Sequence, residues 1–223
     1  MRALALVLCA AALIVPGCAR KQKSPYLVYV SNEGSGDMTV IDPAEPEPVG
    51  VIQLGKRPRG IHANRGFIYV ALSGSPAAPP GVDESTLPPP DRSADGVGVV
   101  DLAAKQVSRK LFGGSDPEQF AFSQDGSLIY VANEDAAGVS VVEIASGKVR
   151  ANIKTGEEPE GVTLSPDGKQ VWVTSEDQGS VAVIDTASNQ VVKTIKVGRR
   201  PRSVAILPDG SRARLDARRW KLP

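Results

Sequence analysis

The sequence predicts an all-β chain, a β-propeller of four-stranded antiparallel blades with about four repeats present. Three observations predict it. A short proline-centred turn recurs at intervals of 59, 42 and 42 residues, and apolar runs rich in Val, Ile and Tyr fill the intervals. Asp-Gly pairs recur at 125–126, 167–168 and 209–210, where Gly accepts the positive φ of a tight hairpin. A period of about 40–45 residues in strand-like sequence is typical of one propeller blade per repeat.

The repeat that starts at Pro117 shows the four strands that we expect in each blade. Its apolar runs are five or six residues long, which suits strands better than helices. The third run alternates, with Val139 and Val141 on one side and Ser140 and Val142 on the other, as in a strand buried on one face and half covered on the other. The expected strands are 118–123, 128–133, 139–144 and 148–153.

The first and last strands of the repeat region are of different types. Sixteen candidate strands lie between Tyr26 and Leu207. The first, 26–30, matches the second strand of a blade, and the last, 203–207, matches a first strand. If these two share a blade, the chain closes as a four-bladed propeller; if they do not, it is an incomplete larger propeller.

The N-terminus predicts a lipoprotein signal peptide over residues 1–18. Arg2 and a short apolar run precede Val15-Pro16-Gly17-Cys18, which resembles a bacterial lipobox with Cys18 as the lipidated residue. Ordinary cleavage at the same place is the alternative. Residues 19–25 then form a polar tether, and Ala19 favours the outer membrane, so we expect a periplasmic, lipid-anchored protein. Cys9 leaves with the signal peptide, and no thiol remains for a disulfide or a metal site.

Two segments depart from the repeat, which spans 26–210. Residues 74–95 carry six prolines among Ser, Asp and Glu, and we expect an extended loop there that is either functional or a neutral insertion. Residues 211–223 lose the repeat pattern within a few residues of Gly210. We expect an irregular basic tail and, from its abruptness, a C-terminally truncated chain.

Charge is balanced overall and segregated locally. Lys and Arg number 26 against 25 Asp and Glu, which argues against a nucleic-acid partner. The proline turns, however, are basic, acidic, acidic and basic in chain order. Because such turns share one rim of a propeller, we expect a partner-binding rim that steers a charged partner. Its residues are Arg57, Arg59, Asp116, Glu118, Glu158, Glu160, Arg200 and Arg202.

The segments Leu128-Ile-Tyr-Val-Ala-Asn133 and Ser165-Pro-Asp-Gly168 resemble the repeat of the YVTN-family β-propeller proteins over roughly residues 26–210. The turns at 57–60, 116–118 and 158–161 are also similar to the β-propeller protein associated with pyrroloquinoline-quinone (PQQ) dependent catabolism. That second resemblance implies an accessory role beside a periplasmic quinoprotein dehydrogenase. The family is usually longer, near seven blades.

The search for catalytic chemistry is mostly negative. His62 is the one histidine, on an inner-type strand, and a structural role is favoured over channel lining. Neither a Cys-x-x-Cys-His motif nor a Gly-x-Ser-x-Gly elbow is present. Glu33, Glu134 and Glu176 recur after second strands and suit either solvated loop acids or a cation site.

We therefore expect a non-enzymatic, envelope-anchored propeller that has no cofactor or metal and binds a protein or small ligand on its loop-rich face. One alternative is a propeller subunit of a quinone-dependent oxidoreductase. Another is a non-functional truncated fragment.

Overall fold

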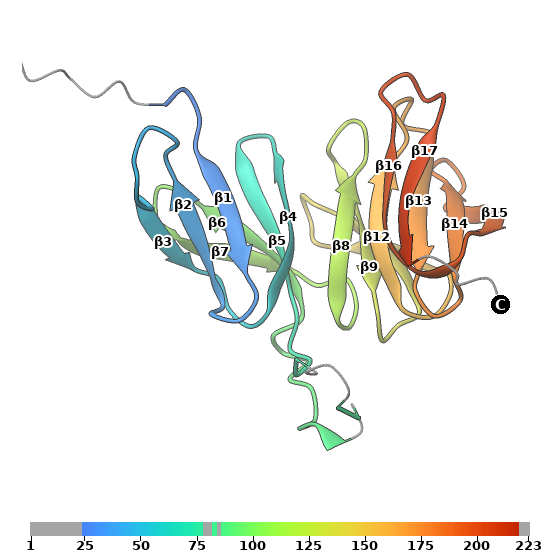
Figure 1. The fold of residues 1–223 in the computed structure, drawn as a ribbon, viewed down its shortest axis with the longest axis horizontal. Helices are drawn as coiled ribbons and strands as arrows, with labels where there is room; N and C mark the ends of the chain where they lie inside the picture. Colours follow the sequence, from blue (N-terminus) through green and yellow to red (C-terminus); the bar gives the residue numbers. More distant parts are fainter. Residues whose placement is uncertain (1–23, 78–81, 84–85, 219–223) are drawn as a thin grey trace, which may run out of the picture.

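A computed structural model describes residues 24–77, 82–83 and 86–218, and it confirms the predicted fold class. The described residues form seventeen strands in five antiparallel sheets that follow one another along an arc (Figure 1). The predicted lipidation residue Cys18 and most of the tether lie outside the described residues. No helix in the described part of the chain is long and apolar enough to cross a membrane.

Three of the sheets are complete blades of four strands, and we name the five sheets A to E in chain order. The strands of the complete blades run in sequence from the concave side of the arc to its outside. Sheet B holds β4 (Pro58–Asn64), β5 (Phe67–Leu72), β6 (Gly96–Asp101) and β7 (Gln106–Leu111). Sheet C holds β8 (Pro117–Phe122), β9 (Leu128–Asn133), β10 (Gly138–Glu143) and β11 (Val149–Lys154). Sheet D holds β12 (Pro159–Leu164), β13 (Gln170–Ser175), β14 (Ser180–Asp185) and β15 (Gln190–Lys196).

The two end sheets have fewer strands. Sheet A holds β1 (Val28–Asn32), β2 (Asp37–Ile41) and β3 (Gly50–Gln53), which correspond to the second, third and fourth strands of a blade. Sheet E holds β16 (Arg199–Ile206) and β17 (Ala213–Arg218), which correspond to the first and second.

The hydrophobic core lies between neighbouring sheets. One cluster joins sheets A and B, with Met38 and Val70 fully buried. A second joins sheets B and C around Phe120, and a third joins sheets C and D around Tyr130. Each sheet is therefore stabilised mainly by its neighbours, as in other repeat architectures.

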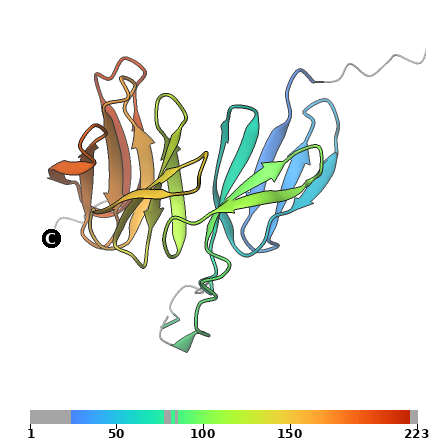
Figure 2. The same cartoon turned by 180° about the vertical axis from the view of Figure 1, so that it is seen from behind.

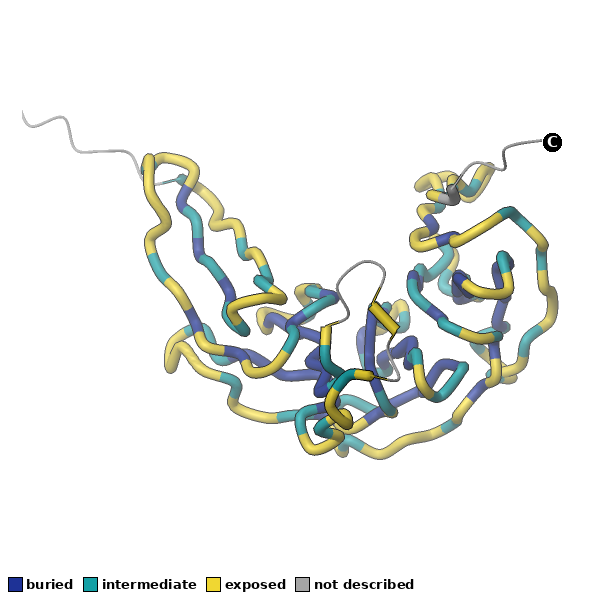
Figure 3. Tube along the Cα trace, turned by 60° about the horizontal axis from the view of Figure 1, so that its bottom comes forward, coloured by how far each residue is buried: buried dark blue, intermediate teal, exposed yellow. Residues whose placement is uncertain are grey.

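The arc is open between its two ends (Figure 3). Of the two alternatives left open by the sequence, the pairing of 203–207 with 26–30 is not formed: among the described residues β1 pairs with β2, and β16 pairs with β17. Seen from behind, the two end sheets again lie at opposite ends of the molecule, and the described residues of the 74–95 segment project from one rim between them (Figure 2).

The expectation of an irregular tail after Gly210 was wrong for residues 213–218. The Pro208-Asp209-Gly210 turn closes a hairpin, with the Leu207 amide donating to the Arg212 carbonyl at 2.9 Å. Strand pairing needs only backbone groups, so β17 forms although its residues lack the aromatic-valine pattern of the other second strands. The described residues thus form the sixteen strands predicted between Tyr26 and Leu207 and one more, β17.

Candidate functional site

The four proline turns lie at one end of the inner strands β4, β8, β12 and β16, and their charged residues face the concave side of the arc. The residue before each proline has a left-handed backbone, with φ between 39° and 51°, and a glycine two residues earlier also has positive φ. This shared geometry orients the residues on either side of each proline in the same way. The left-handed residues are Arg57, Asp116, Glu158 and Arg200.

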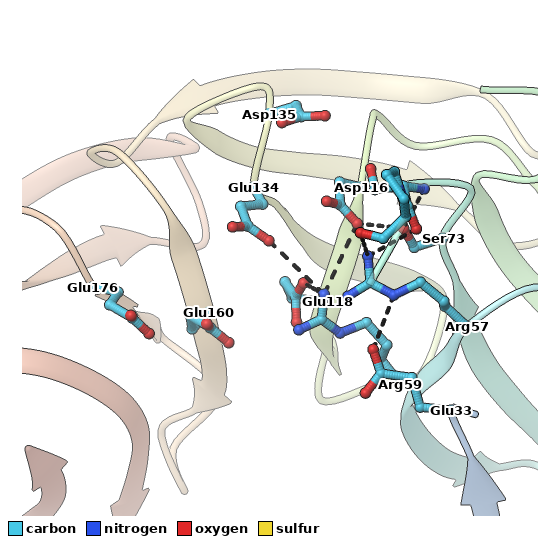
Figure 4. A network of polar contacts seen from close by, with 12 residues as sticks. Glu33, Arg57, Arg59, Ser73, Asp116, Glu118, Glu134, Asp135, Glu160 and Glu176 are labelled. Carbon is cyan, nitrogen blue, oxygen red and sulfur yellow. Dashed lines mark hydrogen bonds and ion pairs between the residues drawn. The ribbon is translucent and has the colours of Figure 1, made fainter. Parts of the chain in front are cut away.

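Backbone hydrogen bonds connect the first three turns to the end of the second strand in their own blades. The Glu134 amide donates to the Asp116 carbonyl at 2.9 Å, and the Glu176 amide donates to the Glu158 carbonyl at 2.8 Å. These bonds bring the recurring loop glutamates beside the turn residues. The loop glutamates and the turns therefore form one rim (Figure 4).

Between sheets B and C, one arginine lies within ion-pair distance of three carboxylates. Arg59 forms an ion pair with Glu118, and its Nη1 lies 3.9 Å from Asp116 Oδ1 and 3.8 Å from Glu134 Oε2. Glu118 is 3% exposed and the Arg59 side chain is 18% exposed. The Ser73 hydroxyl donates to Asp116, which supports that carboxylate from sheet B.

Arginines also pair with carboxylates of the neighbouring sheet between sheets D and E. Arg202 Nε lies 2.7 Å from Glu176 Oε2 and Arg202 Nη2 lies 3.7 Å from Glu160 Oε1, while Arg200 pairs with the other oxygen of Glu176. Glu176 is 2% exposed. A buried carboxylate of this kind is tolerated because its partner charge is close.

Between sheets A and B the contact is again an ion pair, and it also holds the inserted segment. Arg57 Nε donates to Glu33 at 2.9 Å, and its Nη1 donates to the Ser75 and Pro76 carbonyls at 2.9 and 3.2 Å. Asp95, at the end of the insertion, accepts from the Gly74 amide at 2.7 Å.

Sheets C and D meet differently, through carboxylates on both sides. Glu158 of sheet D lies beside Asp177 of the same sheet and close enough to Glu134 of sheet C to feel its charge, and among the described residues neither Glu158 nor Asp177 has an arginine or lysine in ion-pair contact. Partial burial, the Asp177 contact and the charges of Glu134 and Glu176 raise the pKa of Glu158 to about 7. Burial also raises the pKa of Glu160 to about 7, against the opposing effect of Arg202. Carboxyls here thus outnumber the cations that neutralise them.

A metal site is not assigned to the acidic group between sheets B and C. Ligand atoms of Asp116, Glu118 and Glu134 lie within 4.8 Å of one another, but Arg59 already supplies the cation at their centre. The alternative of a cation site at the recurring glutamates therefore has no support at Glu134.

A cavity of about 460 Å³ lies on the same rim, between the loops of sheet A, the first proline turn and the insertion. Its wall includes two ion pairs: Arg57 with Glu33, and Lys56 Nζ with Asp91 Oδ2 at 2.7 Å. Backbone of Gly36 and Gly55 and the rings of Pro76 and Pro88 line the rest. The inserted segment thus shapes a polar hollow that a small ligand could enter.

Arg57 and Arg59, two arginines of the predicted rim, are not exposed turn positions. Their side chains are 17% and 18% exposed and bind acids on neighbouring sheets. Much of the segregated charge seen in the sequence is therefore used between blades. Two contributors were missed, Ser73 and Asp95, because only the fold brings residues so distant in sequence to the turns.

His62 lies on β4, edge-on to Phe120 with ring centroids 4.8 Å apart. Its side chain is solvent-accessible on the concave side, and the surrounding protein lowers its pKa by desolvation, partly opposed by a hydrogen bond with Gln119. The imidazole thus combines a structural contact with Phe120 and an exposed position on the inner strand.

Comparison with known proteins shows the family to which the chain belongs. The model of the cytochrome D1 heme domain matches residues 91–214, more than half of the chain. The chain belongs to this family. No curated protein matches it. The YVTN and PQQ-associated resemblances stay predictions.

Solved structures support the fold. The Kuenenia stuttgartiensis hydrazine synthase is 24% identical with a TM-score of 0.70, covering 85% of this chain and 51% of that one. A functionally unknown protein from Desulfotomaculum acetoxidans is 15% identical with a TM-score of 0.66, covering 85% of this chain and 58% of that one. At these identities the likeness concerns fold alone, and the chain spans little more than half of each.

The family name implies haem, so we tested whether the residues fit it. Haem iron takes His, Cys, Met or Tyr as axial ligand. The matched region holds no His, Cys or Met, and its one tyrosine, Tyr130, is fully buried in the core. The excess of carboxylates on the rim would also repel haem carboxylates. Within the matched region the residues do not fit a haem, and we derive no chemistry through one.

Proposed function

We propose that the protein is a non-enzymatic, envelope-anchored propeller whose loop-rich rim binds a partner that presents a cationic group. The observation that carries the proposal is the carboxylate excess between sheets C and D. Across this junction Glu158 and Asp177 of sheet D face Glu134 of sheet C, whereas the neighbouring junctions have an arginine. An incoming ammonium or guanidinium would take the place that Arg59 and Arg202 fill on either side.

Electrostatics also favours this reading over a purely structural role. Rim charges that stay accessible act mainly on the rate and salt dependence of association. Glu158 is half-buried and Asp177 is exposed, so both can be reached from solvent. The PQQ-associated resemblance adds the kind of partner, a periplasmic quinoprotein dehydrogenase, and the cavity beside the insertion is the place that we propose for a small ligand.

Capture of the partner tests the proposal. Glu158→Gln with Asp177→Asn should weaken partner recovery from an envelope extract and reduce its salt dependence, without loss of stability, because the change removes repulsion. Glu143→Gln is the matched control, since Glu143 lies at the opposite end of its blade beside Arg150. Equal recovery of the same partner by the double variant and the wild type would contradict the proposal.

Membrane anchoring is tested separately through Cys18. Cys18→Ser should move the protein from the membrane to the soluble periplasmic fraction, since acyl chains contribute about 0.8 kcal/mol per buried methylene. Fractionation of the same culture, with the Cys9→Ser protein as control, measures it. A Cys18→Ser protein that is processed to the wild-type size and stays on the membrane would refute lipidation.

A haem-binding redox subunit is the second candidate, because the family match favours it. The residue chemistry above opposes it. Titration of the purified chain with haem distinguishes the binding propeller from the redox subunit. A saturable Soret shift that is lost in His62→Phe and His62→Ala would support the redox subunit.

A further inference from the structure

The first strand of sheet A has an open edge where every complete blade has an inner strand. β1 corresponds to β5, β9 and β13, each of which pairs with an inner strand on its concave side, whereas within the described part of the chain β1 pairs with β2 alone. Its apolar residues are correspondingly uncovered: Val28 and Val30 are each 40% exposed. An exposed strand edge with apolar side chains is a ready template for another strand.

The last inner strand, β16, has a poorly matched neighbour. In the register of β16 with β17, Val204 faces Leu215 and Ala205 faces Arg214. The residue in Arg214's place is Tyr69, Tyr130 or Trp172 in the complete blades. Arg214 and Asp216 are both exposed, so β17 contributes backbone pairing with little blade packing.

β1 has the aromatic-valine pattern of a second strand, which β17, the present neighbour of β16, does not have. Three blades define the register: Ile61, Phe120 and Val162 each pair with the valine of the second strand. Applied to β16 and β1, this register pairs Val204 with Val30, Ala205 with Tyr29 and Ile206 with Val28. The same alignment puts Arg200 beside Glu33, so the charges are complementary.

We propose that β1 is the docking edge for β16 of a second copy of this chain, which displaces β17. The resulting blade would be composite, with one inner strand from one copy and β1–β3 from the other. A single chain does not bring the two edges together, because its three inter-sheet cores fix the curvature that holds them apart (Figure 3). Two arcs facing each other present both edges reciprocally and close as a twofold-symmetric ring. This inference is independent of the proposed rim function.

Cysteine crosslinking in the register tests the proposal. In the full chain with Cys9→Ser and Cys18→Ser, Val30→Cys and Val204→Cys should form a disulfide between two copies, because paired strand positions fall within disulfide reach. Val28→Cys with Val204→Cys is the control, two residues out of register. Light scattering of the uncrosslinked protein should give twice the chain mass, and Arg214→Tyr, which improves β17 as a second strand, should reduce crosslinked dimer.

Three results would overturn the proposal. A disulfide within one chain would show that the chain closes on itself. Equal crosslinking in the two registers would show non-specific edge contact. A monomer without crosslink in either register would show that the edge has no copy of this chain as its partner.

Discussion

Two neighbouring blade junctions of the same architecture are joined by opposite electrostatics. Between sheets B and C, Arg59 reaches across to Glu118 and the acids around it, whereas between sheets C and D, carboxylates meet carboxylates. Both junctions have a hydrophobic core beneath the rim. The difference therefore lies in the rim alone, and it separates charges that hold blades together from charges available to a partner.

As a consequence, substituting a rim residue should change the free energy of unfolding differently at the two junctions. A buried charge without its partner carries a desolvation penalty of several kcal/mol. Neutralising a half-exposed carboxyl among other carboxyls should instead stabilise the folded state, because its removal relieves repulsion. The two junctions should thus respond in opposite directions to neutral substitutions.

The largest expected effect is at Arg59. Arg59→Ala leaves Glu118 buried without its cation, and we expect a loss of about 3–5 kcal/mol in the free energy of unfolding. Arg150→Ala removes an ion pair with Glu143 whose side chains are 49% and 28% exposed, and should cost less than about 1 kcal/mol. Urea unfolding monitored at Trp172 measures both. Similar losses in the two variants would mean that the B–C junction does not depend on this ion pair.

The second effect is a pH dependence that belongs to the C–D junction. The pKa values of Glu158 and Glu160 are raised to about 7 from an ordinary value of 4.5, so the folded state binds more protons than the unfolded state between these limits. The free energy of unfolding should therefore fall as pH rises from 4.5 to 7, by on the order of 1 kcal/mol after solvent screening.

Glu158→Gln with Glu160→Gln should remove most of that slope. Thermal unfolding across this pH window measures it, with Glu143→Gln as control, because the pKa of Glu143 is lowered by Ser146 and Arg150. A slope that persists unchanged in the double variant would place the titrating groups elsewhere.

The repeat explains why the sequence predicted the fold so well and the rim less well. Strand positions such as Tyr69, Tyr130 and Trp172 recur in every complete blade, so their shared role is visible in the spacing alone. The charge of each proline turn was also visible. What spacing could not show was that Arg59 points to the next blade and is largely buried there, because its partners come from β8 and from the loop after β9.

The same limit applies at the ends of the arc. The type of β1 and β16 was read correctly from the pattern, whereas the pattern left open whether they pair, since pairing depends on the curvature that three cores impose together. β17 was missed because backbone pairing after a tight turn leaves little trace in side-chain pattern.

The smallest effect comes from placing an arginine in the acidic C–D junction, so that it resembles the junctions that contain an ion pair. Glu158→Arg places arginine where Arg57 and Arg200 already occupy the same left-handed turn, so the backbone should accept it. The new side chain can pair with Asp177 or Glu134, and because Asp177 is exposed, we expect a gain of about 0.2–1 kcal/mol. Glu158→Gln is the matched control, since it removes repulsion without adding a pair. Stability in the arginine variant no higher than in the glutamine variant would show that accessible carboxyls on this rim do not receive a cation, and it would weaken the case that a partner supplies one.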